Sequence, residues 1–189
     1  MYFKDKIDDI IAVLENGGLL LYPTDTIWGL GCDAQNVEAI EKIYALKNRP
    51  KDKPLTILVD SVEMLKKYIP KIHPRIETLH VYHVKPLTLI YENSNDLPEI
   101  LLGKNRSAGI RIVKDEFCHI LIREFGRPIV STSANLSGEP FPESFGEISS
   151  VILSGVDYVA KHRQEEKQKQ QPSVVARFDE KGELTFLRT

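Results

Sequence analysis

Three short stretches place hydroxyl, amide and basic side chains where predicted strands or helices end. Thr24 and Asp25 follow an apolar strand. Lys47 and Arg49 follow a helix, and a run of hydroxyls with one amide (131–135) follows another strand. Ligands of open α/β sheets tend to bind beyond the carboxyl ends of the strands. Cations together with uncharged donors suit a polyphosphate that carries a ribose, so these stretches predict an anion-binding site.

Lys47 and Arg49 have the charges that phosphate oxygens need. Residues i and i+2 of an extended stretch project to the same side, and Pro50 pushes Arg49 towards an extended backbone. The lysine would then act as a point charge and the arginine as a planar fork on one polyphosphate. Taken alone, the pair also fits a basic helix end that complements the helix dipole.

The other candidate residues have structural alternatives too. Thr24 and Asp25 fit a turn with a capping side chain. Arg111, in the predicted strand 108–113, fits a structural ion pair as well as a bound carboxylate, and the stretch 131–138 fits a polar loop. The five histidines lack metal-ligand spacing, and neither common glycine-rich nucleotide motif occurs. The residues alone therefore indicate an α/β domain that binds an anion.

Apolar periodicity predicts the helices around these residues. The first spans 5–16, with Asp5 as its cap and Gly17-Gly18 at its end. Asn36 and Ser61 are predicted caps of two further helices, and the first of these should fray near Lys47. Other predicted helix signals are Pro74 at a start, Gly126 at an end, and a capping box formed by Ser144 and Glu147.

Short apolar runs predict buried strands between these helices. They cover 19–22, 55–59, 87–91, 108–113 and 128–133, and two later runs, 173–178 and 183–188, predict a closing hairpin. Helices that alternate with buried strands predict a layered α/β domain, α+β in strict usage. The hairpin predicts a mixed sheet. The polar stretch 161–172 is expected to be a solvated loop, or a lid in which Arg163 reaches a phosphate.

Composition bounds the class of protein. The chain has 189 residues, 42% of them hydrophobic, and a net charge of −2, which favours a single soluble domain over a dedicated nucleic-acid binder. Two isolated cysteines, Cys32 and Cys118, indicate a reducing compartment. No apolar run has the length of a signal peptide core or a membrane helix, so we expect a cytoplasmic protein without a membrane partner.

Taken together, the motifs resemble those of the YrdC/Sua5 family in its short form. The stretches are "YPTDTIWGLGCDA", "IYALKNRPKDKPLTILV" and "VSTSANLSGEP" in this order, with "SAGIRIV" and "KPLTLIY" as further matches. The resemblance covers residues 5–160 well and the tail weakly. It implies a twisted mixed sheet flanked by helices, with a concave basic cavity, here as one domain over 1–189.

The resemblance also implies a reaction, the synthesis of threonylcarbamoyl-adenylate for the t6A modification of tRNA. The amine of L-threonine captures bicarbonate or CO₂ as a carbamate, which attacks the α-phosphate of ATP and releases pyrophosphate. The protein would mainly position the reactants and neutralise charge, with Mg²⁺ on the phosphates. Further partners implied are tRNA or tRNA-modification proteins.

The motif matches assign residues to the two substrates. On the ATP they place Lys47, Arg49, Ser133 and Asn135. On the threonine they place Thr24, Arg111 and Ser173. No side chain is assigned as a chemical catalyst, and none as a metal ligand. Gly29 and Gly31 are expected to let the backbone pack closely behind the site.

Two departures from the family pattern leave alternatives open. The family's W-P-G-P-L-T is here the stretch 83–88, "HVKPLT", and its P-S-T is here Pro172-Ser173-Val174. A diverged member that uses another carbamoyl acceptor is one alternative. An RNA-binding module without adenylation is the other, based on the basic residues of the tail (Lys161, Arg163, Lys167 and Lys169).

Overall fold

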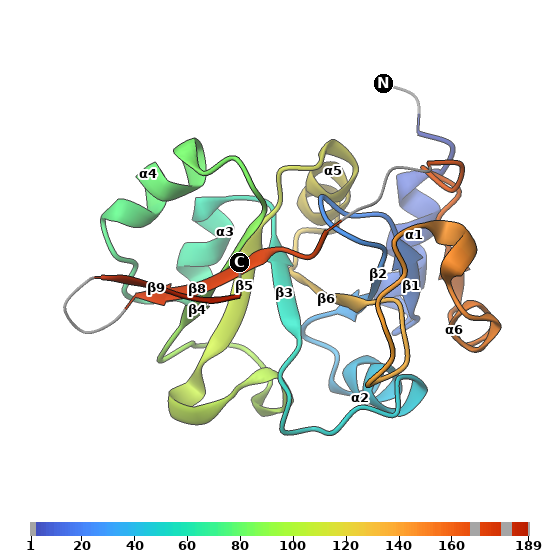
Figure 1. Ribbon diagram of the computed structural model, residues 1–189, viewed down its shortest axis with the longest axis horizontal. Coiled ribbons are helices and arrows are strands. Elements are labelled where there is room, and N and C mark those ends of the chain that lie inside the picture. Colours follow the sequence, from blue (N-terminus) through green and yellow to red (C-terminus); the bar gives the residue numbers. More distant parts are fainter. Residues whose placement is uncertain (1–2, 167–170, 179–182, 189) are drawn as a thin grey trace.

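The computed structural model describes residues 3–166, 171–178 and 183–188, and within them nine strands form one sheet (Figure 1). The spatial order is β7-β1-β2-β6-β3-β5-β4-β8-β9. The strands are β1 (Leu20–Tyr22), β2 (Gly29–Asp33), β3 (Thr56–Val59), β4 (Leu87–Tyr91), β5 (Ala108–Ile112), β6 (Ile129–Ser133), β7 (Tyr158–Val159), β8 (Val174–Phe178) and β9 (Leu184–Arg188). The predicted strands are confirmed, and β8 and β9 pair antiparallel as the predicted hairpin.

The sheet is mixed, as expected. β3 pairs parallel with β5 and antiparallel with β6, while β6 also pairs antiparallel with β2. The register sets Ser131 of β6 opposite both Gly31 and Thr56, and Thr56 opposite Gly109. Side chains two apart on a strand share a face, so Arg111 lies on the same face as this row. The register therefore gathers the polar residues of three strands on one side of the sheet.

The helices agree with the predicted caps at most positions. They are α1 (Ile7–Glu15), α2 (Val37–Leu46), α3 (Val62–Tyr68), α4 (Arg75–Tyr82), α5 (Glu116–Phe125) and α6 (Ser150–Ser154). The side chains of Asn36 and Ser61 accept from the backbone N–H of Ala39 and Met64 at 3.0 and 3.1 Å. Gly126, with φ of 73°, ends α5. Short 3₁₀ turns span Glu99–Leu101, Lys104–Arg106 and Phe145–Glu147.

Two cap predictions were wrong. Lys6, not Asp5, precedes α1, because the Asp5 carboxylate instead accepts from the Tyr158 hydroxyl and from two backbone N–H groups after it. Ser144 makes no capping hydrogen bond, and Glu147 accepts from the backbone N–H of Glu143 instead. The α-helix of this region starts later, at Ser150, and Ser149 caps it.

The arrangement leaves one concave face on the sheet. Helix α1 packs against β1 and β2, α3 against β3 and β5, and α5 against β3, and Phe117, Leu121 and Ile122 of α5 are buried in the core they share. In Figure 1 the hairpin of β8 and β9 passes in front of β5. This twist brings both ends of the hairpin over β3, β5 and β6, where Ser173 and Arg188 line the same cavity as Thr56, Arg111 and Ser131.

Gly31 illustrates the close packing expected behind the site. A Cβ there would lie 2.3 Å from the carbonyl oxygen of Val130 and 2.8 Å from the ring of Tyr22. We expect Gly31→Ala to lower the free energy of unfolding by about 2–3 kcal/mol, because backbone must move to admit a methyl group. Urea denaturation measures this. Gly146→Ala is the control, since a Cβ at that position meets nothing within 4 Å; equal stability of the two variants would contradict the packing argument.

Candidate active site

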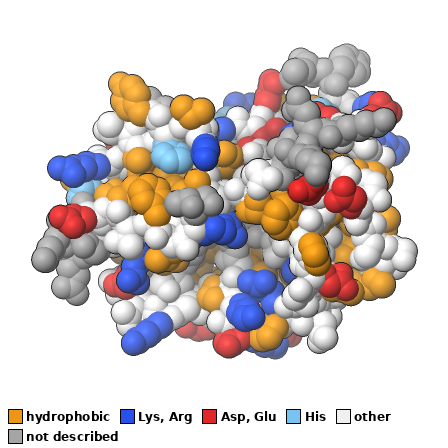
Figure 2. Space-filling view, viewed as in Figure 1, with side chains coloured by type: hydrophobic (Ala, Val, Ile, Leu, Met, Phe, Trp, Pro, Cys, Tyr) orange, Lys and Arg blue, Asp and Glu red, His pale blue; other side chains and the backbone are white. Residues whose placement is uncertain are grey.

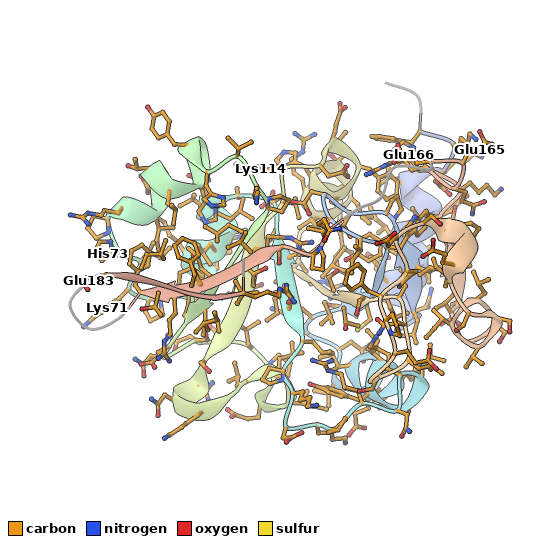
Figure 3. The ribbon with its side chains drawn as sticks, in the orientation of Figure 1. Lys71, His73, Lys114, Glu165, Glu166 and Glu183 are labelled. Atoms are coloured by element: carbon orange, nitrogen blue, oxygen red, sulfur yellow. The ribbon has the colours of Figure 1, made fainter. Side chains whose placement is uncertain are left out.

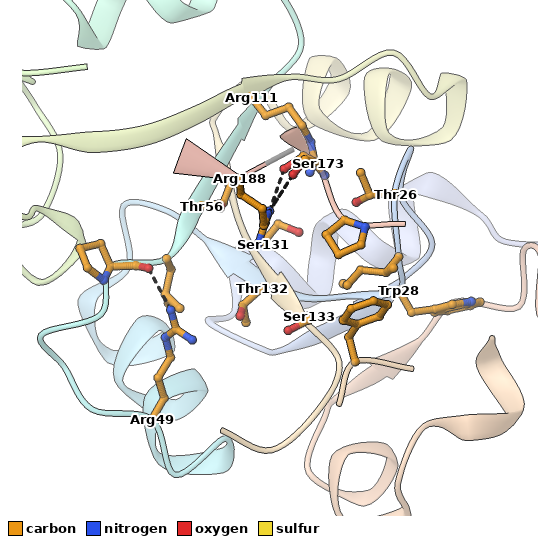
Figure 4. A pocket seen from close by; sticks show the side chains of 16 residues that line it. Thr26, Trp28, Arg49, Thr56, Arg111, Ser131, Thr132, Ser133, Ser173 and Arg188 are labelled. Carbon is orange, nitrogen blue, oxygen red and sulfur yellow. Dashed lines mark hydrogen bonds between the residues drawn. The ribbon is translucent and has the colours of Figure 1, made fainter. Parts of the chain in front are cut away.

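A cavity of about 190 Å³ opens on the concave face and brings together four of the seven predicted site residues (Figure 4). Arg49, Arg111, Ser133 and Ser173 line it, from four segments that are far apart in the sequence. Figure 4 shows Arg111 and Arg188 at one side, Arg49 at the other, and the hydroxyls of 131–133 between them. The geometry therefore offers two cationic ends separated by neutral donors.

The cavity is basic, as expected. Among the described residues, its lining contains three arginines (49, 111 and 188) and no aspartate or glutamate. Figure 2 shows basic side chains grouped near the centre of this face of the molecule. A concave, low-dielectric wall with one sign of charge concentrates oppositely charged ligands. The site therefore attracts anions although the whole chain is slightly acidic.

Arg111 makes the ion pair that its structural alternative predicted and also faces the cavity. Its NH2 lies 3.1 Å from Oδ1 of Asp25, and both side chains are nearly inaccessible, at 5% and 6% exposed. The contact is poorly directed, because Oδ1 of Asp25 forms no hydrogen bond and Nε of Arg111 has no partner among the described residues. A buried, unpaired N–H is costly unless a ligand accepts it. The guanidinium can thus hold a second carboxylate beside that of Asp25.

Ser173 belongs to a small hydroxyl and guanidinium cluster in the cavity wall. Its Oγ lies 2.8 Å from Oγ1 of Thr88, and the NH2 of Arg188 donates to the Ser173 carbonyl at 2.8 Å. Partial burial and the nearby Arg111 cation lower the pKa of Arg188. An anion between these two guanidiniums would relieve their repulsion.

Sequence reasoning missed Arg188. It lies 15 residues after Ser173 and contacts it only because β8 and β9 fold back on each other. The predicted hairpin contained the signal, since antiparallel pairing returns the end of the second strand to the start of the first. The register pairs Arg188 with Val175, two residues after Ser173, and the long arginine side chain reaches back to the Ser173 carbonyl.

Lys47 and Arg49 do not converge as predicted. Asn48 between them adopts φ of 49°, a left-handed conformation that asparagine tolerates, so the stretch turns instead of extending. Lys47 is 1% exposed, and its Nζ donates to the backbone carbonyls of Ser133 and Asn135. Arg49 stays at the cavity, where it donates to the carbonyls of Lys53 and Pro54 at 3.0 and 3.2 Å. One cation thus supports the loop 133–135, and the other faces the ligand space.

The buried position of Lys47 predicts a pH-dependent stability. Burial, with the Arg49 cation nearby, lowers the pKa of Lys47 to about 8 from 10.5. Below pH 8 the amine is charged in both the folded and unfolded chains, and the cost of burying that charge is fully present. Between pH 8 and pH 10.5 the lysine keeps its proton in the unfolded chain and loses it in the folded chain. The free energy of unfolding contributed by Lys47 therefore rises with pH in this range.

The measurement is urea denaturation of the wild type and of Lys47→Met at several pH values from 7 to 10.5. We expect the difference in unfolding free energy to move in favour of the wild type as the pH rises above about 8. Subtracting the unfolding free energy of the variant from that of the wild type at each pH removes the contribution of all other titrating groups. A difference that stays constant across this range would contradict the lowered pKa.

Thr24 and Asn135 shape the walls but do not line this cavity. Thr24 is buried, and its Oγ1 donates to the carbonyl of Ile27 and accepts from the N–H of Thr26 at 2.8 and 3.0 Å. The structural alternative for Thr24, a turn, is therefore present, and within this turn it is Thr26 that lines the cavity. Asn135 donates to the carbonyls of Leu136 and Glu139, and it lines an adjoining cavity of about 180 Å³.

In the segment 161–166 Arg163 makes contacts within the protein, so the phosphate contact suggested for it stays a prediction, and residues 167–170 of the predicted loop lie outside the described residues. The Arg163 guanidinium pairs with Asp115 and Glu166 at 2.9 and 2.7 Å, and it does not line the cavity. Within the described ranges there is no group of three or more His, Cys, Asp or Glu residues placed to hold a metal. In the same ranges, each helix is too short or too polar to cross a bilayer.

Comparison with known proteins identifies a family and named relatives of this chain. Residues 12–189 match the Sua5/YciO/YrdC family, which carries the description "Telomere recombination". A "Threonylcarbamoyl-AMP synthase" of Photobacterium profundum is 32% identical over 161 residues, which are 80% of this chain and 87% of the relative. A protein of the same name from Pseudoalteromonas translucida is 33% identical over 158 residues, covering 82% and 84%.

A solved structure agrees with the fold. Sua5 of P. abyssi, crystallised in complex with L-threonine, superposes with a TM-score of 0.83 at 27% identity. The alignment covers 96% of this chain and 53% of that one, so this chain spans about half the length of that protein. The mixed sheet flanked by helices is therefore the fold expected from the sequence motifs.

Proposed function

The chain belongs to the Sua5/YciO/YrdC family, and we propose from this premise that it is a threonylcarbamoyl-AMP synthase. The observation that carries the proposal is the cavity itself, because it joins Arg49, Arg111, Ser133 and Ser173 in one basic, hydroxyl-lined space. ATP and L-threonine are the substrates, and bicarbonate or CO₂ supplies the carbamoyl carbon. The product then serves the t6A modification of tRNA by partner proteins.

The ATP binds at the side of the cavity formed by Arg49 and the loop 133–135. The Arg49 guanidinium faces the phosphates, and the Ser133 hydroxyl adds a neutral donor. Lys47 supports the nucleotide site indirectly, because its hydrogen bonds to the carbonyls of Ser133 and Asn135 fix the loop that carries these residues. Asn135, which lines the adjoining cavity, forms the outer limit of the ATP side of the site.

The threonine binds at the opposite side, near Arg111. Arg111 lines the cavity, and its planar guanidinium suits the substrate carboxylate. Ser173 offers a hydroxyl to the amino acid, and Thr24 orders the turn that presents Thr26. Arg188, which contacts Ser173 and lies near Arg111, neutralises charge where the two substrates meet.

The reaction needs positioning more than acid or base chemistry. The threonine amine forms a carbamate with CO₂, a carbamate oxygen attacks the α-phosphorus, and the bond to pyrophosphate breaks. Negative charge builds on the phosphate oxygens and the leaving pyrophosphate, and fixed guanidiniums stabilise it without reorganisation. Holding both substrates between two cationic ends converts their encounter into a unimolecular step.

Mg²⁺ would accompany the nucleotide. The cavity lining offers hydroxyls and guanidiniums and, among the described residues, no carboxylate. Magnesium prefers oxygen ligands and often binds through substrate phosphates and water. We therefore propose that it would bind the triphosphate, where it would neutralise charge.

An adenylation assay tests the function. The purified chain is mixed with ATP, Mg²⁺, bicarbonate and L-threonine, and threonylcarbamoyl-AMP is sought by mass spectrometry. We expect product only when threonine and bicarbonate are both present. ATP binding without product would redirect the proposal to another carbamoyl acceptor, and absence of ATP binding would favour the RNA-binding alternative.

A further inference from the structure

We propose that Arg163 is a positioning residue that fixes Arg111 at the amino-acid end of the cavity. It acts through the loop 24–26, which carries Asp25, the ion-pair partner of Arg111. This inference rests on the proposed function and adds to it a role for the polar segment 161–166. The argument follows the contacts from that segment to the cavity.

The segment 161–166 is anchored to the body of the protein. The buried carboxylate of Asp5 accepts from the backbone N–H groups of Lys161 and His162 at 2.9 and 2.7 Å. The His162 ring stacks on Phe117 of α5 with centroids 5.1 Å apart. Figure 3 shows the end of the segment, at Glu165 and Glu166, beside α1. The backbone immediately before Arg163 is therefore held against the body of the protein.

Arg163 connects this anchored segment to the loop 24–26. Its NH1 donates to the carbonyl of Thr24 at 3.1 Å and to Oδ2 of Asp115 at 2.9 Å, while its Nε donates to Glu166. The side chain is 17% exposed, so these charge-assisted bonds are partly shielded from water. Arg163 also adopts φ of 64°, a left-handed conformation in which long side chains are uncommon. Such strain persists where the surroundings over-determine it, and it clusters at functional sites.

The loop 24–26 connects Arg163 to the cavity through Asp25. The Cys118 thiol donates to the carbonyl of Pro23 at 3.3 Å, so the two carbonyls just before Asp25 are each held by a neighbouring segment. Asp25 then contacts Arg111 through Oδ1 and accepts from the backbone N–H of Lys114 through Oδ2. Because the Arg111 contact is poorly directed, small shifts of Asp25 change where the guanidinium points. Release of the Thr24 carbonyl would therefore misplace Arg111 without removing it.

Arg163→Gln tests the inference by kinetics with each substrate varied in turn. Misplacing a substrate-binding group without touching the rest of the site should raise KM for L-threonine about tenfold and leave KM for ATP within about twofold. A merely structural role would lower Tm and leave both KM values unchanged, or raise them together. Either of those results would overturn the inference.

Asp115→Asn gives a second, independent variant. Oδ1 of Asp115 caps α5 by accepting from the Cys118 N–H at 3.0 Å, and an asparagine side chain keeps that acceptor. The substitution removes the charge that holds Arg163, so we expect the same selective rise in KM for L-threonine with α5 intact. Lys4→Gln is the control, since it breaks an exposed ion pair to Glu165 on the same segment and should change neither KM.

Calorimetry with L-threonine separates this inference from the proposed function. If the wild type binds threonine but forms no threonylcarbamoyl-AMP, the proposed reaction fails, and weaker threonine binding by Arg163→Gln still supports the positioning role. If the wild type forms product and Arg163→Gln keeps its affinity for threonine, the positioning role alone is overturned.

Discussion

Arg49→Ala is expected to lower kcat/KM for ATP about 100-fold or more while the protein stays folded, as for the loss of one donor that stabilises transition-state charge. Arg49 lines the cavity, and its guanidinium is partly exposed and, among the described residues, is bonded to carbonyls of its own loop, at Lys53 and Pro54. Removing it costs little folding energy, because such surface bonds contribute weakly to stability. The loss of activity should therefore exceed any loss of stability by a wide margin.

Lys51→Ala is the matched control for this variant. Lys51 lies two residues away in the same loop and forms an exposed ion pair with Glu41 at 2.7 Å. It removes the same amount of net charge from the loop but does not line the cavity. Pyrophosphate release and thermal unfolding of both variants measure the two effects. Equal activity of the two variants would show that Arg49 acts only through the general charge of the loop.

The same loop shows where prediction from sequence ended. The helix end near Lys47, the basic character of 47–49 and the role of Pro50 all follow from local rules, and α2 does end at Leu46. The conformation of Asn48 does not follow from them, because a left-handed turn at asparagine is permitted but not required. Tertiary contacts decide it here, since the buried Lys47 amine reaches the carbonyls of the loop after β6.

Predictions of capping show a similar division. Asn36, Ser61 and Gly126 act within one turn of their own helix, where sequence alone suffices. Asp5 is an equally good cap by type, but three donors from 158–162 compete for its carboxylate. These donors come from a segment more than 150 residues away, and local patterns carry no information about them. Seven of the nine strands were predicted from the length of their apolar runs, but β2, which is rich in glycine, and the two-residue β7 were not.

The ordered motifs predicted more than residue types and periodicity did. They indicated the family and the fold, and they pointed to seven site residues, of which four line one cavity. Thr24 illustrates the remainder, since it matches the motif but its hydroxyl is used inside the turn, while Thr26 faces the ligand space. A motif therefore marks the segment that forms a site more securely than it marks the atom that touches the ligand.

Arg111→Met is expected to be the most damaging substitution, because it combines two losses. Asp25 would remain as a buried carboxylate, 6% exposed, without its cation. Breaking a buried ion pair on one side costs about 3–5 kcal/mol of stability. The cavity also loses the guanidinium proposed for the threonine carboxylate, so KM for L-threonine should rise about 100-fold, as for the loss of a buried charge-assisted pair.

A second substitution separates the two losses. Adding Asp25→Asn to Arg111→Met removes the unpaired charge, so most of the lost unfolding free energy should return, as measured by urea denaturation. The threonine KM should stay high, because the asparagine restores the fold around the loop and supplies no cation to the substrate. If the double variant regains threonine affinity together with stability, Arg111 serves only the ion pair, and the threonine end of the site must lie elsewhere. Recovery of stability alone assigns the buried guanidinium to the substrate, since nothing else about the fold would then differ from the wild type.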